Sequence, residues 1–185
     1  KYYSIELAKI RLGSAGTIAI YGKKSFGKSN FLKHIIGVAS KSLNPIIAIY
    51  DDKRKNMKSK IAGWIDGDIR IESIGNGENV GENISDNVVS EIRKFRRAEP
   101  EKFIVYIIGN KAFYRGDSND NPSPICELKQ DIENAGISNS LFVFFDVPRI
   151  TDYRTRSEFN SVLEHMFIFD DILRIKETFD DNKQT

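Results

Sequence analysis

The stretch TIAIYGKKSFGKSN, Thr17 to Asn30, runs from an apolar segment through a loop with two glycines into a segment with helical spacing. Its central part, GKKSFGKS (Gly22 to Ser29), matches GxxxxGK[ST] at every fixed position. Glycines let such a loop turn its backbone amides inward around an anion, and the helix that follows adds its N-terminal amides and partial positive charge. The stretch therefore predicts a phosphate-binding loop between a strand and a helix.

This loop also predicts the cofactors. Lys28 would reach the β- and γ-phosphates of a nucleotide, and the Ser29 hydroxyl would coordinate magnesium, so ATP and Mg²⁺ are expected. Lys23 and Lys24 either add positive charge near the phosphates or point to solvent, and the sequence leaves both readings open. The predicted nucleotide-binding residues are Gly22, Lys23, Lys24, Ser25, Phe26, Gly27, Lys28, Ser29 and Asn30.

Length and composition indicate one globular domain. The chain has 185 residues, of which 40% are hydrophobic and 29% charged. We expect one domain over residues 1–175 and a frayed tail over 176–185. Because the chain begins at Lys1 and not at Met, one expectation is a domain cut from a longer protein.

Charge and cysteine usage limit the function classes. The 28 basic residues nearly balance the 26 acidic ones, so the net charge of +2 argues against a nucleic-acid partner and against an anionic membrane surface. The single cysteine, Cys126, cannot form an internal disulfide and is read as a loop or helix-start thiol. No apolar run is long enough to span a bilayer, so direct membrane insertion is not expected.

Alternating strand and helix patterns predict an α/β fold with a mostly parallel central sheet flanked by helices. The predicted strands are continuously apolar, as in strands buried on both faces, and cover residues 17–21, 45–50, 68–74, 102–109, 141–147 and 165–169. Helices are predicted over 28–40, 82–98 and 125–136, and loops over 75–83 and 115–124. In the second helix, apolar residues recur at helical spacing, and the basic residues are expected to lie outward or at the helix end; these are Arg93, Lys94, Arg96 and Arg97.

Hydrolysis would need an acid at the end of a second apolar strand. The obvious strand, KFIVYIIGN, ends in Gly109 and Asn110, which offer no carboxylate. Asp146 at the end of LFVFFDV is the candidate catalytic acid, and Asp170 and Asp171 are weaker candidates. Asp51 and Asp52 follow the second strand and either line the nucleotide pocket or close a turn, and both readings stay open. Arginines after the fifth strand are read first as structural or interface residues; these are Arg149, Arg154 and Arg156.

The order of these parts resembles the FtsK/SpoIIIE-type ATPase modules, most of all the degenerate C-terminal modules of EssC/EccC, the membrane-anchored motor of type VII secretion. The resemblance rests on TIAIYGKKSFGKSNFLKHI, PIIAIYDDKRK, SDNVVSEIRKFRR, KFIVYIIGN and NAGISNSLFVFFDVPRITDYRTRSEFN. Better-kept modules end the strand corresponding to KFIVYIIGN in Asp-Asn or Asp-Asp, whereas this chain has Gly109. The departure at Gly109 puts hydrolysis in doubt and leaves nucleotide binding intact.

This resemblance implies a RecA-type sheet and a soluble domain on the cytoplasmic side of the membrane, within a larger membrane-anchored chain. The implied partners are neighbouring ATPase modules of the same chain and secreted small helical proteins or their C-terminal signals. The implied activity is ATP binding with weak or no hydrolysis, in a regulatory or substrate-docking role. Three alternatives stay open: a DNA-translocating or genome-packaging ATPase that uses Asp146, a small-molecule kinase, and a structural module whose loop binds no nucleotide.

Overall fold

The computed structural model describes residues 15–51, 56–65, 67–74, 84–114, 123–133, 139–151 and 153–169. Several predictions fall outside these ranges: the loop over 75–83, most of the loop over 115–124, the tail, and the side chains of Asp52, Asp170 and Asp171.

A six-stranded sheet forms the centre of the molecule, in the order β3-β2-β4-β5-β1-β6. All five strand pairs found among the described residues are parallel, which confirms the predicted parallel sheet. The strands are β1 (Ala15–Gly22), β2 (Ile46–Tyr50), β3 (Ile71–Ser73), β4 (Ile104–Ile108), β5 (Ser140–Phe145) and β6 (His165–Phe169).

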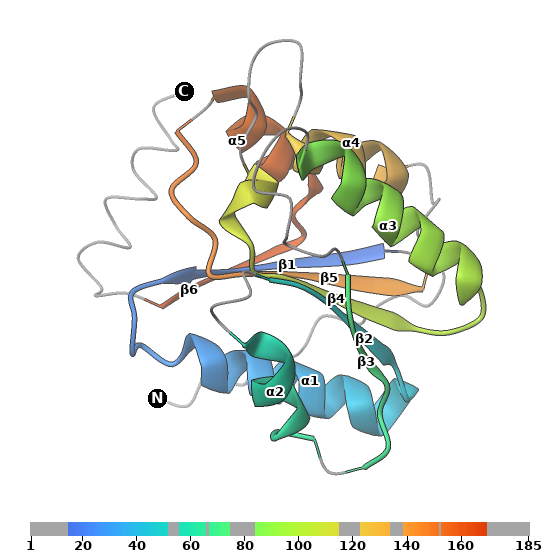
Figure 1. Ribbon diagram of the computed structural model, residues 1–185. Coiled ribbons are helices and arrows are strands. Elements are labelled where there is room, and N and C mark those ends of the chain that lie inside the picture. The colour runs from blue at the N-terminus through green and yellow to red at the C-terminus, as the bar shows by residue number, and fades with distance from the viewer. Residues whose placement is uncertain are drawn as a thin grey trace.

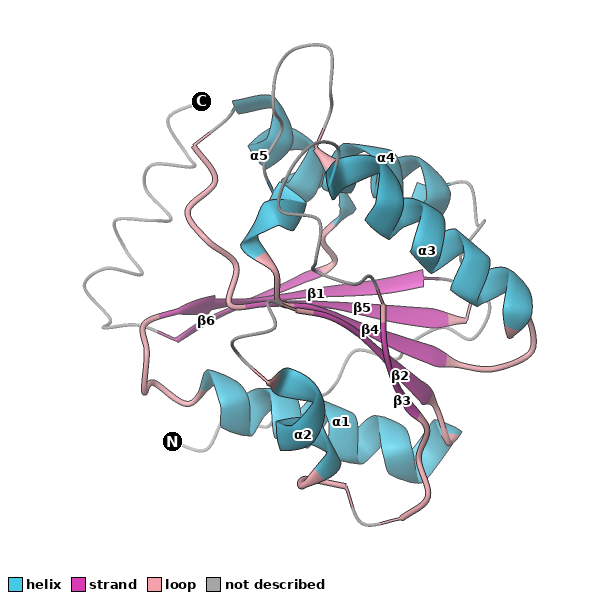
Figure 2. Cartoon of the chain, viewed as in Figure 1, coloured by secondary structure: helices cyan, strands magenta, loops and turns pink. Residues whose placement is uncertain are grey.

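Helices cover both faces of this sheet (Figures 1 and 2). One face carries α1 and α2, and the other carries α3, α4 and α5. Their bounds are α1 (Lys28–Leu43), α2 (Met57–Ala62), α3 (Ile84–Ala98), α4 (Pro124–Glu133) and α5 (Tyr153–Val162), with a short 3₁₀ helix η2 (Lys111–Tyr114).

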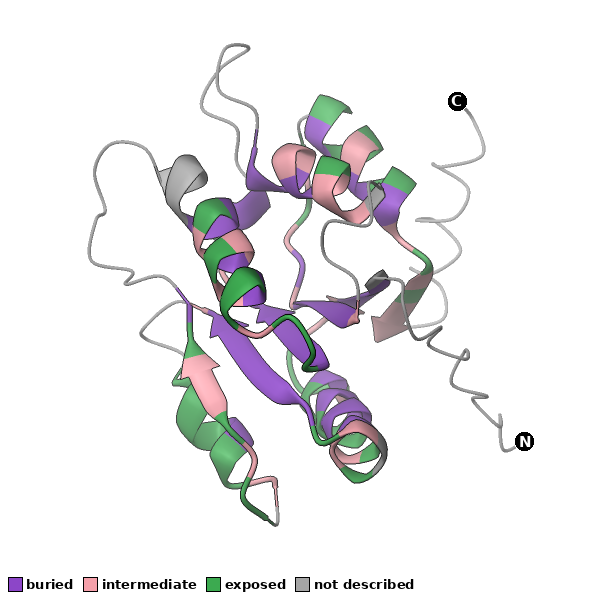
Figure 3. Ribbon diagram, turned by 90° about the vertical axis from the view of Figure 1, so that its right-hand side faces the viewer, coloured by how far each residue is buried: buried purple, intermediate pink, exposed green. Residues whose placement is uncertain are grey.

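The alternation of side chains along each strand divides the core in two. On β4, Val105 and Ile107 pack in the cluster on the α1 face, whereas Tyr106 and Ile108 pack in the cluster under α3 and α4. The middle strands β2, β4 and β5 are buried at every residue, while the edge strands β3 and β6 are only partly buried (Figure 3). Continuous apolar runs therefore predicted the central strands correctly because both of their faces are covered.

Two of the described α-helices were not predicted from the sequence. The helix α2 has only six residues, too few for a period to show. The helix α5 buries Thr155, Phe159 and Val162, so its inner stripe contains a single large apolar side chain in its first two turns. The other described helices, α1, α3 and α4, lie where their apolar spacing predicted them.

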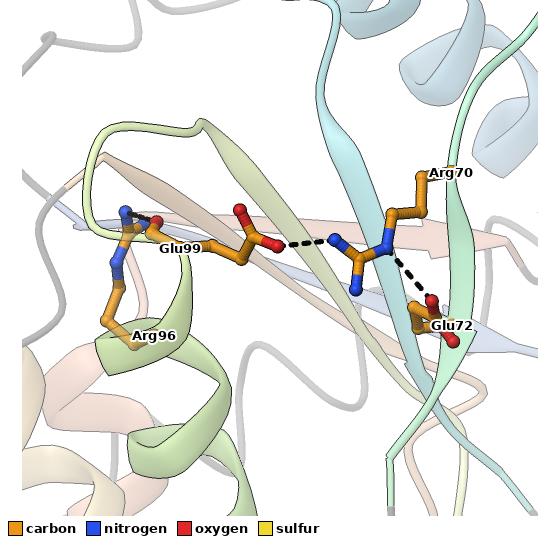
Figure 4. A network of polar contacts seen from close by, with 4 residues as sticks. All are labelled: Arg70, Glu72, Arg96 and Glu99. Atoms are coloured by element: carbon orange, nitrogen blue, oxygen red, sulfur yellow. Dashed lines mark hydrogen bonds and ion pairs between the residues drawn. The ribbon is translucent and has the colours of Figure 1, made fainter.

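Arg96 lies in the last turn of α3, which agrees with the predicted outward or helix-end position of the basic residues, but it is not exposed as Lys94 and Arg97 are. Arg96 is buried, with 7% of its surface exposed, and its guanidinium donates hydrogen bonds to the carbonyls of Glu99, Pro100 and Lys102. It closes the turn between α3 and β4, because a planar guanidinium can serve several carbonyls at once. Glu99 in the same turn also pairs through its side chain with Arg70, which pairs with Glu72 on the edge strand β3 (Figure 4).

Among the described residues, no helix is long and apolar enough to cross a membrane.

Candidate functional site

The loop from Gly22 to Ser29 lies at the carboxyl end of β1, inside the sheet. β1 pairs with β5 on one side and β6 on the other, whereas the next strand, β2, lies beyond β5 and β4. The chain thus changes direction across the sheet after β1. In parallel α/β sheets, ligands bind outside the carboxyl ends of the strands at such a switch point.

The backbone of this loop turns where the sequence pattern predicts. Gly22 and Gly27 have φ values of 123° and 96°, and Ser25 between them has 71°. A Cβ atom on Gly22 would lie 2.0 Å from the carbonyl oxygen of Phe169 at the end of β6, so no other residue fits there. The Lys23 amide donates to that same carbonyl at 3.0 Å, which fixes the start of the loop against β6.

The loop leads directly into the N-terminus of α1. Gly27 is the residue before the helix, no side chain caps this described helix end, and no acid stands in its first turn. The first-turn amides and their positive partial charge are therefore suited to accept an anion. Ser29 and Asn30 are exposed in this first turn.

The Lys28 ammonium lies within the curve of the loop. It donates to the carbonyls of Gly22 at 2.5 Å and Lys23 at 2.6 Å, and its Nζ lies 3.3 Å from Oδ1 of Asp146. A phosphate group that enters the loop would meet this ammonium and exchange for some of these partners. Only 9% of the surface of Lys28 is exposed.

The other side chains of the loop contribute less. Lys24 is exposed, Phe26 is 45% exposed, and the Lys23 ammonium lies 5.7 Å from the centre of the Phe26 ring. Of the two readings left open for Lys23, its packing over Phe26 favours a position on the outer side of the loop.

The candidate acid Asp146 joins this site through an unusual backbone conformation. It follows β5 with a φ of 56°, the left-handed region that aspartate tolerates better than most residues. By strand alternation it would face α3 and α4, since Phe144 packs in that cluster, yet its carboxylate reaches Lys28. The sequence made Asp146 only a candidate for this site, and the structure places its carboxylate beside Lys28.

Two tyrosines near Asp146 were not identified from the sequence. Tyr21 is the second-last residue of β1 and Tyr114 ends η2, and burial raises the pKa of both phenols above the ordinary value of 10.0. The charge of Asp146 adds to the shift in the pKa of Tyr114. Tyrosine at the end of an apolar run is read as core material, and only the fold shows that Tyr114 lies near both Tyr21 and Asp146.

Asp51 and Gly109 lie at the same edge of the sheet, further from the loop than Asp146: Gly109 follows β4, one strand beyond β5, and Asp51 follows β2, two strands beyond β5. Tyr50 pairs with Ile108, and the Gly109 amide donates to the Tyr50 carbonyl at 2.8 Å. Both carboxylate oxygens of Asp51 are buried. Asn110 follows, and its carbonyl accepts from the Phe113 amide at 3.2 Å as η2 begins.

The remaining candidates do not join the site. Arg149, Arg154 and Arg156 are exposed, and Arg156 lies 5.8 Å from the centre of the Tyr153 ring. Cys126 lies at the start of α4, as expected for a helix-start thiol. Within the described parts of the chain, no group of three or more histidine, cysteine or carboxylate side chains could hold a metal ion by itself.

No family model matches the chain, and no curated protein matches it in sequence. Among solved structures, it is similar to a prototypical ATPase from the type III secretion system of pathogenic bacteria, with a TM-score of 0.51 and 13% identity. That match covers 85% of this chain and 51% of the ATPase, so the chain spans about half of that protein.

Two further solved structures align less closely. The genome packaging NTPase B204 from Sulfolobus turreted icosahedral virus 2, in complex with AMP, gives a TM-score of 0.49 at 14% identity and covers 82% of this chain and 83% of B204. The type III secretion ATPase EscN from enteropathogenic E. coli gives 0.46 at 14% identity, with coverage of 83% and 42%. With its parallel six-stranded sheet and loop after β1, the chain has a RecA-like α/β P-loop fold, as predicted.

Proposed function

We propose that this chain binds ATP through the loop from Gly22 to Ser29. The observation that carries the proposal is the arrangement of this loop: left-handed turns at Gly22 and Gly27 curve the backbone around the Lys28 ammonium at the uncapped start of α1. A curved loop, a helix N-terminus and a lysine in one place make a site for phosphate groups.

The residues present fit a nucleotide with its magnesium ion. The loop amides and Lys28 would hold the phosphates, and the Ser29 hydroxyl, exposed in the first turn of α1, would bind the ion. When bound, Mg²⁺ neutralises phosphate charge and orients the phosphate chain. The loop is fixed for this task because β6 holds its first residues through the Phe169 carbonyl.

We further propose that ATP hydrolysis is weak. Glycine and asparagine follow β4 at the position where related modules carry an acid, and an amide is a poor general base. Asp146 is engaged by Lys28, which reduces its availability as a base. Such a module would act through ATP binding, without hydrolysing the ATP.

The finer proposal follows the resemblance to FtsK/SpoIIIE-type modules of EssC/EccC. On that basis the chain serves as a regulatory or substrate-docking module of a membrane-anchored type VII secretion motor. Its partners would be neighbouring ATPase modules and secreted small helical proteins or their C-terminal signals. This assignment is supported by the order of the sequence segments and by the P-loop fold.

A second candidate is an active DNA-translocating or genome-packaging ATPase. It is favoured by the 3.3 Å approach of Asp146 to Lys28, which puts a carboxylate beside the nucleotide loop. DNA-stimulated hydrolysis that disappears in Asp146→Ala would support this candidate, whereas hydrolysis that DNA does not change would oppose it.

Thermal melting with and without Mg·ATP, together with ATP turnover, tests the proposal. At an ATP concentration of about 100 times Kd, binding should stabilise the fold by about 2.7 kcal/mol, or about 5–10 °C in Tm. Lys28→Ala should remove the shift, while Lys33→Ala, an exposed lysine on the same helix, should keep it. No shift in the wild type would overturn nucleotide binding, and fast turnover would overturn weak hydrolysis.

A further inference from the structure

The ends of β2 and β4 place Asp51 beside Gly109 on the face of the sheet that carries α1. Ile49 and Ile107, two residues earlier on each strand, both pack in the core cluster with α1. Alternate residues of a strand share a face, so Asp51 and Gly109 continue these two rows at the carboxyl edge. The helix α1 begins with Lys28 and Ser29, so this face is also the face of the nucleotide loop.

The carboxylate of Asp51 occupies the space that a side chain on residue 109 would take. A Cβ atom on Gly109 would lie 2.8 Å from Oδ1 and 3.4 Å from Cγ of Asp51. A glycine at position 109 is what permits this approach. An aspartate at 109 would meet Asp51 in both volume and charge, so the site has room for one carboxylate and not two.

This relationship changes the meaning of the missing acid. From the sequence, Gly109 is the loss of a carboxylate at the end of β4; in the fold, a carboxylate stands at that place and comes from the neighbouring strand. We propose that Asp51 supplies from β2 the acid that β4 lacks, and that it helps to hold the Mg²⁺ ion that accompanies the nucleotide. The inference rests on the proposed ATP binding at Gly22 to Ser29.

The chemistry of the two available aspartates favours Asp51 for this task. Magnesium in nucleotide sites is bound through one or two carboxylates together with the phosphates and several waters. Asp146 is ion-paired with Lys28 and would compete with the phosphates for the same ammonium. Asp51 has its carboxylate oxygens buried at the carboxyl edge, on the α1 face, at the place that a side chain from β4 would occupy.

The test measures how much Mg²⁺ strengthens nucleotide binding. The affinity for a fluorescent ATP analogue is determined in EDTA and in Mg²⁺, and Mn²⁺ bound to the protein–nucleotide complex is counted by electron paramagnetic resonance. In Asp51→Asn, the increase in nucleotide affinity that Mg²⁺ produces should be smaller by about 10-fold or more, and the affinity for Mn²⁺ should fall similarly. The nucleotide affinity in EDTA should stay close to that of the wild type. Asp68→Asn, which removes an exposed carboxylate elsewhere, is the matched control.

A carboxylate exchange makes the test specific to position. The double variant Asp51→Gly with Gly109→Asp moves the acid back to β4 and should restore most of the Mg²⁺ effect that Asp51→Gly alone loses. Gly109→Asp alone should melt at a lower temperature, because two carboxylates then share one space. This rescue also separates loss of the metal from loss of folding, since a merely structural Asp51 would not be replaced from another strand.

The outcomes distinguish the two proposals. This inference alone would be overturned if Asp51→Asn binds nucleotide normally, with the same increase in affinity from Mg²⁺ and the same Mn²⁺ affinity as the wild type. Absence of nucleotide binding by the wild type in both EDTA and Mg²⁺ would overturn the proposed function and this inference with it.

Discussion

The Lys28 ammonium and the Asp146 carboxylate lie 3.3 Å apart, across the carboxyl ends of β1 and β5. The pair is partly shielded, with 10% of the Lys28 side chain and 37% of the Asp146 side chain exposed. Because Lys28 is also the residue that would meet the phosphates, this ion pair competes with the ligand for one positive charge. A bound phosphate would therefore have to displace the Asp146 carboxylate from Lys28.

Removal of the Asp146 charge should strengthen nucleotide binding in the absence of Mg²⁺. The ion pair is partly exposed, so its contribution is about 1 kcal/mol, and Asp146→Asn should raise the affinity for ATP in EDTA by about fivefold. Isothermal titration of the wild type and the variant measures this change. Glu101→Gln, at an exposed turn, should bind as the wild type does. Weaker binding by Asp146→Asn would mean that the carboxylate supports the ligand and does not compete with it.

Gly22 should be the least replaceable residue of the loop. An alanine there would carry a φ of 123° and place its Cβ 2.0 Å from the Phe169 carbonyl oxygen. Backbone strain of this kind costs about 1–3 kcal/mol before the steric clash is added. Gly22→Ala should therefore lower the free energy of unfolding in urea by at least about 2 kcal/mol and abolish ATP binding. A variant with wild-type stability and affinity would contradict the contact between the loop and β6.

Gly37 offers the opposite result within the next helix. It lies inside α1, and a Cβ built there meets no atom within 4 Å among the described residues, apart from its chain neighbours and the backbone of the helix itself. Alanine loses less backbone entropy than glycine when a helix forms, so Gly37→Ala should raise the free energy of unfolding by about 0.5–1 kcal/mol. Urea unfolding of Gly22→Ala and Gly37→Ala in parallel shows whether the change in the free energy of unfolding depends on the position of the glycine or follows from any replacement of glycine by alanine. A destabilised Gly37→Ala would show that α1 packs more closely at this turn.

The central strands and the nucleotide loop could be predicted because each is marked by a pattern within its own short stretch of sequence. The three central strands are buried on both faces and read as unbroken apolar runs, and the nucleotide loop is defined by its own glycines. The relationships within the site are not local. Asp51 meets Gly109 through the pairing of β2 with β4, and Asp146 reaches Lys28 through a left-handed turn after β5. Neither the register nor that turn has a signature in the sequence.

The buried Arg96 shows a similar limit, because charge alone predicts exposure. Its guanidinium donates to the carbonyls of Glu99, Pro100 and Lys102 in the turn before β4. Arg96→Ala would take the guanidinium donor from all three carbonyls, although the Glu99 carbonyl still accepts from the Lys102 amide, and should lower the free energy of unfolding by about 2–4 kcal/mol. Chemical denaturation measures the loss. Arg97→Ala, at the exposed neighbour, should remain close to the wild type, and equal stability of the two variants would contradict the role of Arg96 in this turn.

Tyr114 should make the stability of the fold depend on alkaline pH. Burial, together with the nearby Tyr21 and the charge of Asp146, raises the pKa of its phenol well above 10.0. Above about pH 10 the unfolded chain releases this proton while the folded chain retains it, so the folded state binds more protons and loses stability as the pH rises. Below pH 10 the phenol is neutral in both states, and its ionisation has no effect.

Tyr114→Phe tests this dependence at two pH values. The Tyr114 hydroxyl is buried without a hydrogen-bond partner among the described residues, so its removal at pH 7 should leave the stability unchanged or raise it by about 1 kcal/mol. Above pH 10, Tyr114→Phe should lose stability less steeply than the wild type. Tyr21 and Tyr106 also have pKa values raised by burial, so part of the slope will remain. Thermal melts from pH 7 to 11, with the exposed Tyr153→Phe as control, measure the difference; an unchanged slope in Tyr114→Phe would mean that the phenol at position 114 ionises within the folded protein.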